Sequence, residues 1–348
     1  MRGGAGGARA LDRKPGASSS RFTRGRGGGG VMNVLVTGAG GPAGVCVIKS
    51  LKGLYRVIAT DIDPLAAGLY LSDQGYVTRK TSDPRFVAEL IRIGKREGVT
   101  VLLPTVQEEL VVLARNRARF ERAGIVPVVS EEEALAIATD KLRTYAFFRE
   151  KSYGPKVFQR STVEFPAVVK PIRSRGGRGF YRCENSAELR VALARNRRAF
   201  GDSVIMEYVD GTEYSVYGIS GRDGRPLVIV PVRRIQAVSE SKKAEIVADA
   251  NLQKVAGEIA SMLKLAGPWN VQLMKSKARI VLIEVNPRFA GTTSLVVASG
   301  VNLPEIAVKV FLGHTITPDE LEFRDHLFMT RYNEEIYLSS DEMLRKTP

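Results

Sequence analysis

The chain has 348 residues, a formal net charge of +15 and 44% hydrophobic residues. This length and apolar content exclude a single small domain and indicate at least two hydrophobic cores. Two Cys and two His residues exclude a disulfide scaffold and argue against a Cys/His zinc site, which needs about four ligands at short spacings. No stretch approaches the roughly 18 consecutive apolar residues of a membrane span, and no secretory leader pattern opens the chain. We therefore expect a cytoplasmic protein with no membrane partner.

Residues 1–31 differ in composition from the rest of the chain. They hold seven Arg or Lys residues against the single Asp12, together with ten of the 34 glycines. Because such a segment has few aliphatic side chains to bury, we expect a disordered basic tail. The Arg24-Gly-Arg26 tract is compatible with a nucleic-acid arm. The alternative is that the tail has no role and that translation starts at Met32, directly before the first strand pattern. We favour this alternative and expect no nucleic-acid partner.

Residues 32–130 are predicted to form one α/β domain with a parallel sheet, because strand and helix patterns alternate along them. The expected elements are a strand at 33–37, a Gly-rich turn at 38–44, a helix to about 52, a strand at 56–60, a helix at about 84–97, a strand at 100–104, a helix at about 108–123 and a short strand at 126–129.

The pattern changes after residue 130 to α+β with antiparallel sheets. We expect helices at about 131–151, 186–198 and 244–265, and short strands at 167–170, 203–207, 214–219, 227–232, 271–274 and 280–285. Residues 331–348 are predicted to be a peripheral tail.

The Gly-rich turn from Gly38 to Gly44 follows a strand and opens a helix, and Asp61 ends the next strand. This context is typical of a dinucleotide-binding fingerprint and, taken alone, predicts NAD with Asp61 on the ribose. A purely structural interpretation is equally supported, since a tight strand-to-helix turn needs glycine whether or not a cofactor binds.

A second motif follows the apolar strand that ends at Lys170. The next residues, Arg173 to Gly179, contain three glycines and three arginines. Glycines let backbone N–H groups approach phosphate oxygens, and arginines neutralise their charge, so this loop predicts a polyphosphate site. It is not a Walker A sequence, because the Gly-Lys-Ser/Thr ending is missing. The alternative is a solvated basic hairpin.

A third segment, residues 205–216, carries acidic residues on two strands joined by a Gly-containing connector. Such groups could meet the adenine edge and ribose hydroxyls of an adenosine, although an exposed acidic hairpin is equally compatible.

The fourth motif is more specific. Glu284 and Asn286 lie two apart on one strand, hence on one sheet face, and Gln272 lies on its predicted partner. These hard oxygen ligands suit Mg²⁺, and Arg288 could hold a transferring phosphoryl group.

With these motifs in order, residues 32–315 resemble the ATP-grasp superfamily, specifically its carbamoyl-phosphate-synthase-like members. The most specific elements are Asn270-Val-Gln272 and Ile283-Glu284-Val285-Asn286-Pro287-Arg288. The resemblance implies a Rossmann-like pre-ATP-grasp domain at 32–130, a linker helix and lid subdomain at 131–206, and a C-terminal ATP-grasp subdomain at 207–330, the last two being the α+β subdomains that enclose ATP.

The resemblance also implies site residues. ATP is expected to contact residues of the lid and of the acidic segment, namely Lys141, Lys170, Arg175, Gly176, Gly177, Gly179, Glu207, Tyr208, Val209 and Glu213. Gln272, Glu284 and Asn286 would coordinate Mg²⁺, for which Mn²⁺ is expected to substitute. Arg288 and Lys170 would be catalytic. Residues that could read the substrate are Thr105, Glu108, Arg233, Gly291 and Thr292. Thr105 and Glu108 could instead cap the next helix.

The implied chemistry is attack of a carboxylate on the γ-phosphate of ATP, followed by capture of the acyl phosphate by an amine or ammonia. The chain has room for one synthetase unit, whereas a carbamoyl phosphate synthase large chain has two. A stand-alone carboxylate–amine ligase therefore fits better, and a homodimer is possible. The alternatives are an NAD(P)-dependent oxidoreductase or epimerase, based on the Gly-rich turn, and a non-catalytic nucleotide sensor.

Overall fold

The computed structural model describes residues 31–174, 177–238 and 240–345. The predicted basic tail therefore lies outside the described residues except for Val31, and so do Arg175 and Gly176 of the predicted phosphate loop. Within the described residues, no helix is long and apolar enough to span a bilayer.

The N-terminal domain is built on a five-stranded parallel sheet with the strand order β3-β2-β1-β4-β5. Its strands are β1 (Asn33–Thr37), β2 (Arg56–Asp61), β3 (Gln74–Val77), β4 (Val99–Pro104) and β5 (Val126–Pro127). Its helices are α1 (Pro42–Leu51), α2 (Ala67–Leu71), α3 (Phe86–Arg96), α4 (Gln107–Arg115) and α5 (Arg117–Glu121). The predicted α/β alternation is confirmed, and α2 and β3 are additional to it.

Both faces of this sheet are covered by helices, which explains why its strands are apolar at nearly every position. Val36 of β1 belongs to a buried cluster with Val47 of α1. Leu35 points to the opposite face and belongs to a cluster with Leu90 of α3. The alternating side chains of β1 thus hold two helical layers onto one sheet.

The prediction of one helix at 108–123 is wrong in one respect, because Asn116 divides this segment into α4 and α5. The backbone of Asn116 has φ −106° and ψ 10°, outside the helical range. Its side-chain amide donates to Val112 O at 2.8 Å and so ends α4. The strand predicted at 126–129 is also shorter than expected, since it pairs with β4 only at Val126 and Pro127.

A six-stranded sheet forms the body of the remaining chain, with the strand order β13-β12-β9-β10-β11-β14. Its strands are β9 (Thr212–Ser220), β10 (Pro226–Val238), β11 (Glu240–Ile246), β12 (Gly267–Lys275), β13 (Ile280–Asn286) and β14 (Phe328–Thr330), and neighbouring strands pair antiparallel. Helix α9 (Ala250–Met262) packs on one face, where Leu252 and Ile259 meet Val216 and Val271. The predicted antiparallel α+β arrangement is confirmed.

The helix predicted at 244–265 is wrong at its beginning, because residues 244–246 belong to β11. The helix starts only at Ala250, where the Asp249 carboxylate accepts hydrogen bonds from the amides of Asn251 and Leu252. This cap satisfies backbone donors that a helix begun six residues earlier would have bonded internally.

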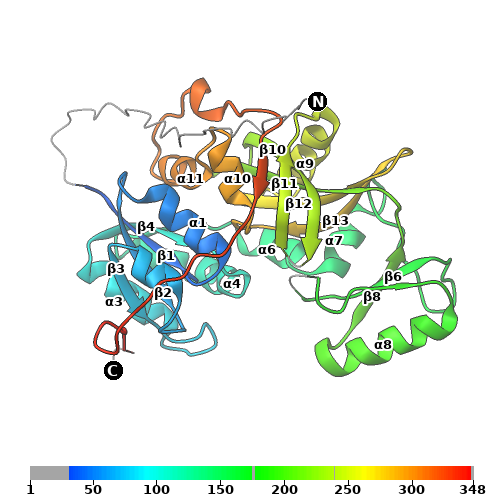
Figure 1. The fold of residues 1–348 in the computed structure, drawn as a ribbon, viewed down its shortest axis with the longest axis horizontal. Coiled ribbons are helices and arrows are strands. Elements are labelled where there is room, and N and C mark those ends of the chain that lie inside the picture. The colour runs from blue at the N-terminus through cyan, green and yellow to red at the C-terminus, as the bar shows by residue number, and fades with distance from the viewer. Residues whose placement is uncertain (1–30, 175–176, 239, 346–348) are drawn as a thin grey trace, which may run out of the picture. The chain divides into compact units, whose positions relative to one another are not determined.

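A smaller three-stranded antiparallel sheet has the order β7-β6-β8. It comprises β6 (Ala167–Pro171), β7 (Tyr181–Cys183) and β8 (Ser203–Glu207), and α8 (Ser186–Phe200) lies along it. Figure 1 shows this sheet and α8 as a unit distinct from the larger sheet. Its core contains Val169 of β6, Leu189 of α8 and Ile205 of β8.

Two helices, α6 (Glu132–Ala138) and α7 (Lys141–Phe148), replace the single helix predicted at 131–151. Asp140 divides them, because its carboxylate accepts from Arg143 N at 3.2 Å and caps α7. This break makes Lys141 the first residue of α7.

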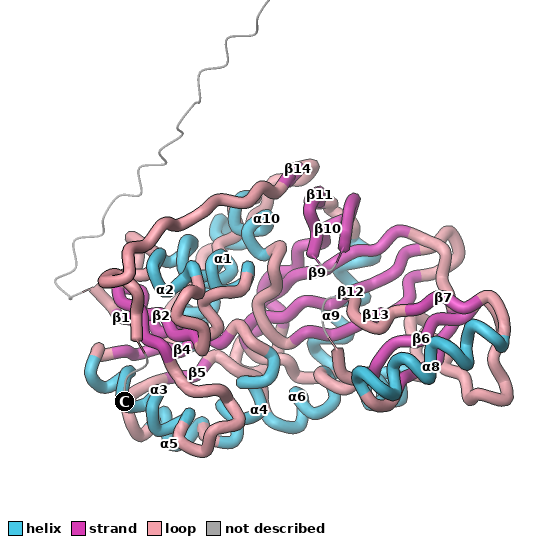
Figure 2. Tube along the Cα trace, turned by 60° about the horizontal axis from the view of Figure 1, so that its bottom comes forward, coloured by secondary structure: helices cyan, strands magenta, loops and turns pink. Residues whose placement is uncertain are grey.

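The C-terminal part contains α10 (Thr293–Ala298), α11 (Leu303–Phe311) and a 3₁₀ turn at Pro318–Leu321 before β14. After β14 the chain runs back over the N-terminal domain, as Figures 1 and 2 show. There Leu344 N donates to the hydroxyl of Tyr70 at 3.2 Å, and Lys49 forms an ion pair with Glu334 at 3.9 Å.

Candidate active site

Lys141 is the first predicted site residue that the fold brings inward. It is 8% exposed at the start of α7. Its Nζ atom lies 2.9 Å from Oε1 of Glu284 on β13 and 3.4 Å from the carbonyl oxygen of Ser174 in the loop after β6. A lysine from the helix thus contacts both the predicted metal-binding strand and the predicted phosphate loop.

Lys170 approaches the same strand from the smaller sheet. Its Nζ atom donates to Ile283 O at 3.0 Å and lies 5.2 Å from the centre of the Tyr145 ring. Burial lowers the pKa of Lys170 to about 7, and the charge of Lys141 acts in the same direction, whereas Glu284 opposes the shift. A bound anion would stabilise the protonated form of a lysine with such a pKa.

Tyr145 of α7 is a neighbour of Lys170 that the sequence motifs do not indicate. Its hydroxyl donates to Ile283 O at 2.5 Å, so this one carbonyl accepts from both side chains. Burial raises the pKa of Tyr145 well above its usual value, so the hydroxyl stays protonated and remains a donor. Aromatic residues at helical spacing resemble ordinary core positions, so no local signal distinguishes Tyr145.

The predicted metal ligands lie on the paired strands β12 and β13. Gln272 lies directly opposite Glu284, and Asn270 lies opposite Asn286. Residues opposite one another in an antiparallel pair share a sheet face. Of these, Asn270 was not among the predicted ligands, although its two-residue spacing from Gln272 is visible in the sequence.

This set fits a hard divalent cation chemically. It offers one carboxylate and amide oxygens, and Mg²⁺ takes few protein ligands together with phosphate oxygens and water. Among the described residues, the buried amide nitrogen of Asn270 has no hydrogen-bond partner, and as a donor it suits a phosphate oxygen rather than the cation itself. Within the described residues, no group of three or more His, Cys, Asp and Glu side chains offers another metal site.

Arg288 lies directly after β13. Its Nη1 atom donates to Phe289 O at 2.8 Å, and its Nη2 atom donates to Oδ1 of Asn286 at 3.4 Å. The arginine expected to hold the phosphoryl group is therefore connected to an expected metal ligand two residues earlier.

The predicted phosphate loop is described at both ends. Arg173 forms an ion pair with Asp140 at 3.2 Å, which ties the start of the loop to the cap of α7. Gly177 and Gly179 have φ values of +68° and +76°, a region that L side chains rarely adopt. At Gly179 a Cβ atom would also come within 2.6 Å of Asn196 and of Pro171. These two positions therefore require glycine for the backbone itself.

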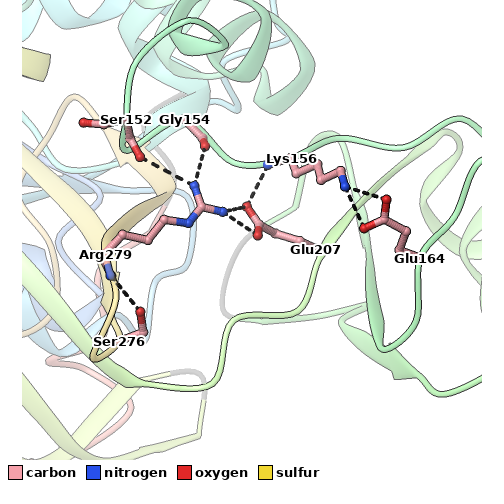
Figure 3. A network of polar contacts seen from close by, with 7 residues as sticks. All are labelled: Ser152, Gly154, Lys156, Glu164, Glu207, Ser276 and Arg279. Carbon is pink, nitrogen blue, oxygen red and sulfur yellow. Dashed lines mark hydrogen bonds and ion pairs between the residues drawn. The ribbon is translucent and has the colours of Figure 1, made fainter.

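Glu207, which ends β8, lies in the polar network of Figure 3. Its carboxylate forms an ion pair with Arg279, from the turn between β12 and β13, and accepts from Lys156 N at 2.8 Å. The network joins the smaller sheet to the hairpin that carries the predicted metal ligands. The Glu207 carboxylate therefore already has partners within the protein. Any contact of residues 207–209 with adenine would have to come from their backbone atoms.

The other predicted adenosine residues have protein partners as well. The guanidinium carbon of Arg182 lies over the ring of Tyr208, 4.1 Å from the centre of that ring. Glu213 on β9 forms an ion pair with Arg234 on β10. The side chain of Arg234 is only 11% exposed, so this ion pair is partly shielded from solvent.

A cavity of about 610 Å³ lies between α4, the junction of α6 and α7, and the loop after β6. Glu108, Asp140 and Ser174 line it, together with several arginines. Because Ser174 also contacts Lys141, the cavity adjoins the two buried lysines, Lys141 and Lys170.

Thr105 has a different role from the one predicted for it. Its hydroxyl donates to Thr37 O at 2.8 Å and to Gly38 O at 3.0 Å and so supports the Gly-rich turn.

Of the remaining predicted substrate residues, Arg233 lies on β10, whereas Gly291 and Thr292 follow β13. Arg233 is paired with Glu245 of β11. Gly291 O accepts from Arg331 at 2.6 Å. Thr292 is buried and hydrogen-bonded with Tyr217, whose pKa is raised by burial and lowered in part by that bond. Gly291 and Thr292 thus share one loop with Arg288, whereas Arg233 points into a separate ion pair.

The Gly-rich turn of the N-terminal domain is packed by protein atoms. Gly40 N donates to Oδ2 of Asp61 at 2.8 Å, so the carboxylate that a dinucleotide site would use binds its own turn. Gly38 has φ +68°, and a Cβ atom there would meet Val106 at 2.2 Å. This geometry favours the structural interpretation of the turn.

A Rossmann-like domain, followed by a small and a large antiparallel sheet that meet at Lys170 and Ile283, defines the ATP-grasp type of fold. Two family models match the chain. Residues 34–129 match the N-terminal domain of PylC-like proteins, and residues 199–335 match the ATP-grasp family of the biosynthetic pathway with the Ter operon. The chain belongs to the ATP-grasp superfamily of ATP-dependent ligases, which use ATP with Mg²⁺, and has a PylC-like N-terminal domain.

Individual relatives are distant. The chain is 26% identical over 271 residues to the 3-methyl-D-ornithine–L-lysine ligase of Methanosarcina barkeri, covering 75% of this chain and 69% of the relative. An L-amino acid ligase from Bacillus licheniformis has a similar structure, with a TM-score of 0.64, 14% identity, and coverage of 84% of this chain and 77% of that one. Pyruvate carboxylase from Rhizobium etli gives a TM-score of 0.67 at 18% identity over 86% of this chain, which spans only 31% of that much longer protein.

Proposed function

We propose that this protein is an ATP- and Mg²⁺-dependent ligase that activates a carboxylic acid as an acyl phosphate and joins it to an amine or ammonia. The observation that carries the proposal is the convergence of Lys141 and Lys170 on the strand segment Ile283 to Glu284. Two buried lysines beside a hard-ligand cluster are suited to a nucleoside triphosphate and its metal, and a structural core has no need of them.

We propose the following roles for the site residues. Lys141 and Lys170 bind ATP phosphates, and the loop from Arg173 to Gly179 covers them. Gln272, Glu284 and Asn286 would hold Mg²⁺, which when bound neutralises phosphate charge. The backbone of residues 207–209 would meet adenine, and Glu213 the ribose. The lid is proposed to extend over residues 131–206.

In the proposed reaction, a carboxylate oxygen of the substrate forms a bond to the γ-phosphorus, and the bond from that phosphorus to the β,γ-bridging oxygen of ATP breaks to release ADP. The amine nitrogen then attacks the carbonyl carbon of the acyl phosphate, inorganic phosphate leaves, and the amine loses a proton. Arg288 would neutralise charge on the transferring group. No side-chain nucleophile is required, since positioning and charge neutralisation supply the catalysis.

The two ligases among the relatives, named for amino acid substrates, support an amino acid as the carboxylate or the amine here. The cavity beside Glu108 and Ser174, at about 610 Å³, falls within the usual size range for small-molecule sites.

ADP release by the purified full chain tests the proposal. Mg-ATP would be supplied with pools of amino acids and other carboxylates, each with and without added amines or ammonia. Release that requires both an acid and an amine is the expected result. ATP binding without release in any pool would contradict the ligase assignment and favour a nucleotide sensor, and absence of ATP binding would contradict the nucleotide site itself.

A further inference from the structure

The chain segment at residues 328–331 is fixed to the edge of the large sheet. Strand β14 pairs with β11, placing Thr330 opposite Lys243 and Phe328 opposite Glu245. The ladder continues one residue further, because Arg331 N donates to Lys242 O at 3.0 Å. The backbone of Arg331 therefore has a defined position, although it begins the segment that the sequence predicts to be a peripheral tail.

The side chain of Arg331 reaches a loop 40 positions away in the sequence. Its Nη2 atom donates to Gly291 O at 2.6 Å. Gly291 lies between Arg288 and the first turn of α10, in the loop that leaves the predicted metal-binding strand. A hydrogen bond from a charged donor is stronger than one between neutral groups, so this contact restrains the loop effectively.

Two contacts within the same loop are short in range. Arg288 donates to Phe289 O, and Thr293 N donates to Ala290 O at 3.0 Å. These two contacts shape the loop locally, and the hydrogen bond between Thr292 and Tyr217 of β9 connects the end of the loop to the large sheet. The bond from Arg331 adds a second connection at Gly291, to the edge of the sheet through β14 and β11.

Arg331 also lies close to the N-terminal domain. Burial raises the pKa of the Cys46 thiol in α1 to about 11, and the charge of Arg331 opposes that rise. The guanidinium is therefore close enough to α1 for its charge to act on Cys46.

We propose that Arg331 is a positioning residue, which holds the loop carrying Arg288 and thereby makes the C-terminal segment part of the active site. The catalytic meaning of this inference rests on the proposed ligase function, whereas the restraint of the loop does not. The two can therefore be tested separately.

The experiment compares Arg331→Ala, Arg331→Lys and the control Tyr332→Ala in the full chain by amide hydrogen exchange. Tyr332 is the neighbouring residue and is 79% exposed. In Arg331→Ala, exchange in peptides covering residues 288–295 is expected to become about tenfold faster, as for the loss of a hydrogen bond from a charged donor. Exchange in β12 should stay unchanged, and Arg331→Lys should recover part of the protection.

A second measurement is acid- and amine-dependent ADP release, in which Arg331→Ala should lower kcat and leave the ATP dissociation constant unchanged. Unchanged loop exchange would overturn the proposal, and so would equally faster exchange throughout the chain, which would show a general role in folding. Faster loop exchange with unaltered kcat would also overturn it. If the wild type releases no ADP with any pool, selective loop exchange would still support the positioning role, while the ligase function would fail.

Discussion

Lys141 and Glu284 form an ion pair of 2.9 Å that joins the first residue of α7 to the middle of β13. The pair unites an expected phosphate ligand with an expected metal ligand, each neutralising the other in this structure. Mg-ATP brings both counter-charges at once, since the triphosphate is an anion for Lys141 and the metal a cation for Glu284. Nucleotide and metal are therefore expected to bind together, because binding of either one alone would leave one charge of the buried pair uncompensated.

Glu284→Gln should remove the single carboxylate of the predicted metal set. We expect Mg²⁺-dependent ATP turnover to fall by at least about 100-fold, as for loss of a main electrostatic group in an active site. A coupled assay for ADP across a Mg²⁺ titration measures this. Glu334→Gln is the matched control, because Glu334 is 70% exposed and its ion pair is long. Turnover at the wild-type level would contradict the metal assignment.

ATP binding should take up protons near pH 8. Burial lowers the pKa of Lys170 to about 7, so the free protein holds this lysine mostly neutral at pH 8, and the triphosphate raises its pKa again. Calorimetric titration in two buffers of different ionisation enthalpy would show the uptake. It should disappear at pH 6, where Lys170 is already protonated, and in Lys170→Met. Binding heat independent of the buffer at pH 8 would refute the assignment of Lys170.

Tyr145→Phe removes the hydroxyl that donates to Ile283 O. We expect the free energy of unfolding to fall by about 1–2 kcal/mol, because one buried hydrogen bond is lost while the Lys170 ammonium still bonds to the same carbonyl. Urea unfolding measures the change. Tyr337→Phe, at an 88% exposed position, should have no effect. Equal stability of the two variants would show that the Tyr145 hydroxyl contributes nothing.

Asn270→Ala should weaken Mg-ATP binding by about tenfold, the equivalent of one hydrogen bond, if its buried amide nitrogen, which has no partner among the described residues, donates a hydrogen bond only in the complex. Calorimetric titration with Mg-ATP gives the affinity. Asn116→Ala serves as the control, since Asn116 ends α4 in the N-terminal domain and should affect stability alone. An unchanged dissociation constant for Asn270→Ala would leave the buried amide without a nucleotide role.

Much of the fold follows from local patterns. The apolar strands of the N-terminal sheet and the two-residue spacing of Glu284 and Asn286 are visible in the sequence, and the structure has the corresponding strands. The errors fall where one polar side chain overrides periodicity. Asn116, Asp140 and Asp249 each bond to a nearby backbone group and so end or begin a helix that apolar spacing alone would continue.

The sequence by itself therefore determined the class of fold and led to the predictions of two phosphate-binding lysines and a hard-ligand strand pair, because each depends on residue type and spacing over a few positions. Only the tertiary structure decided which groups meet. Lys170 reaches Ile283 across 113 positions, and Arg331 reaches Gly291 across 40. Such contacts depend on how sheets and helices pack against one another, and periodicity within a single element carries no information about its distant partner.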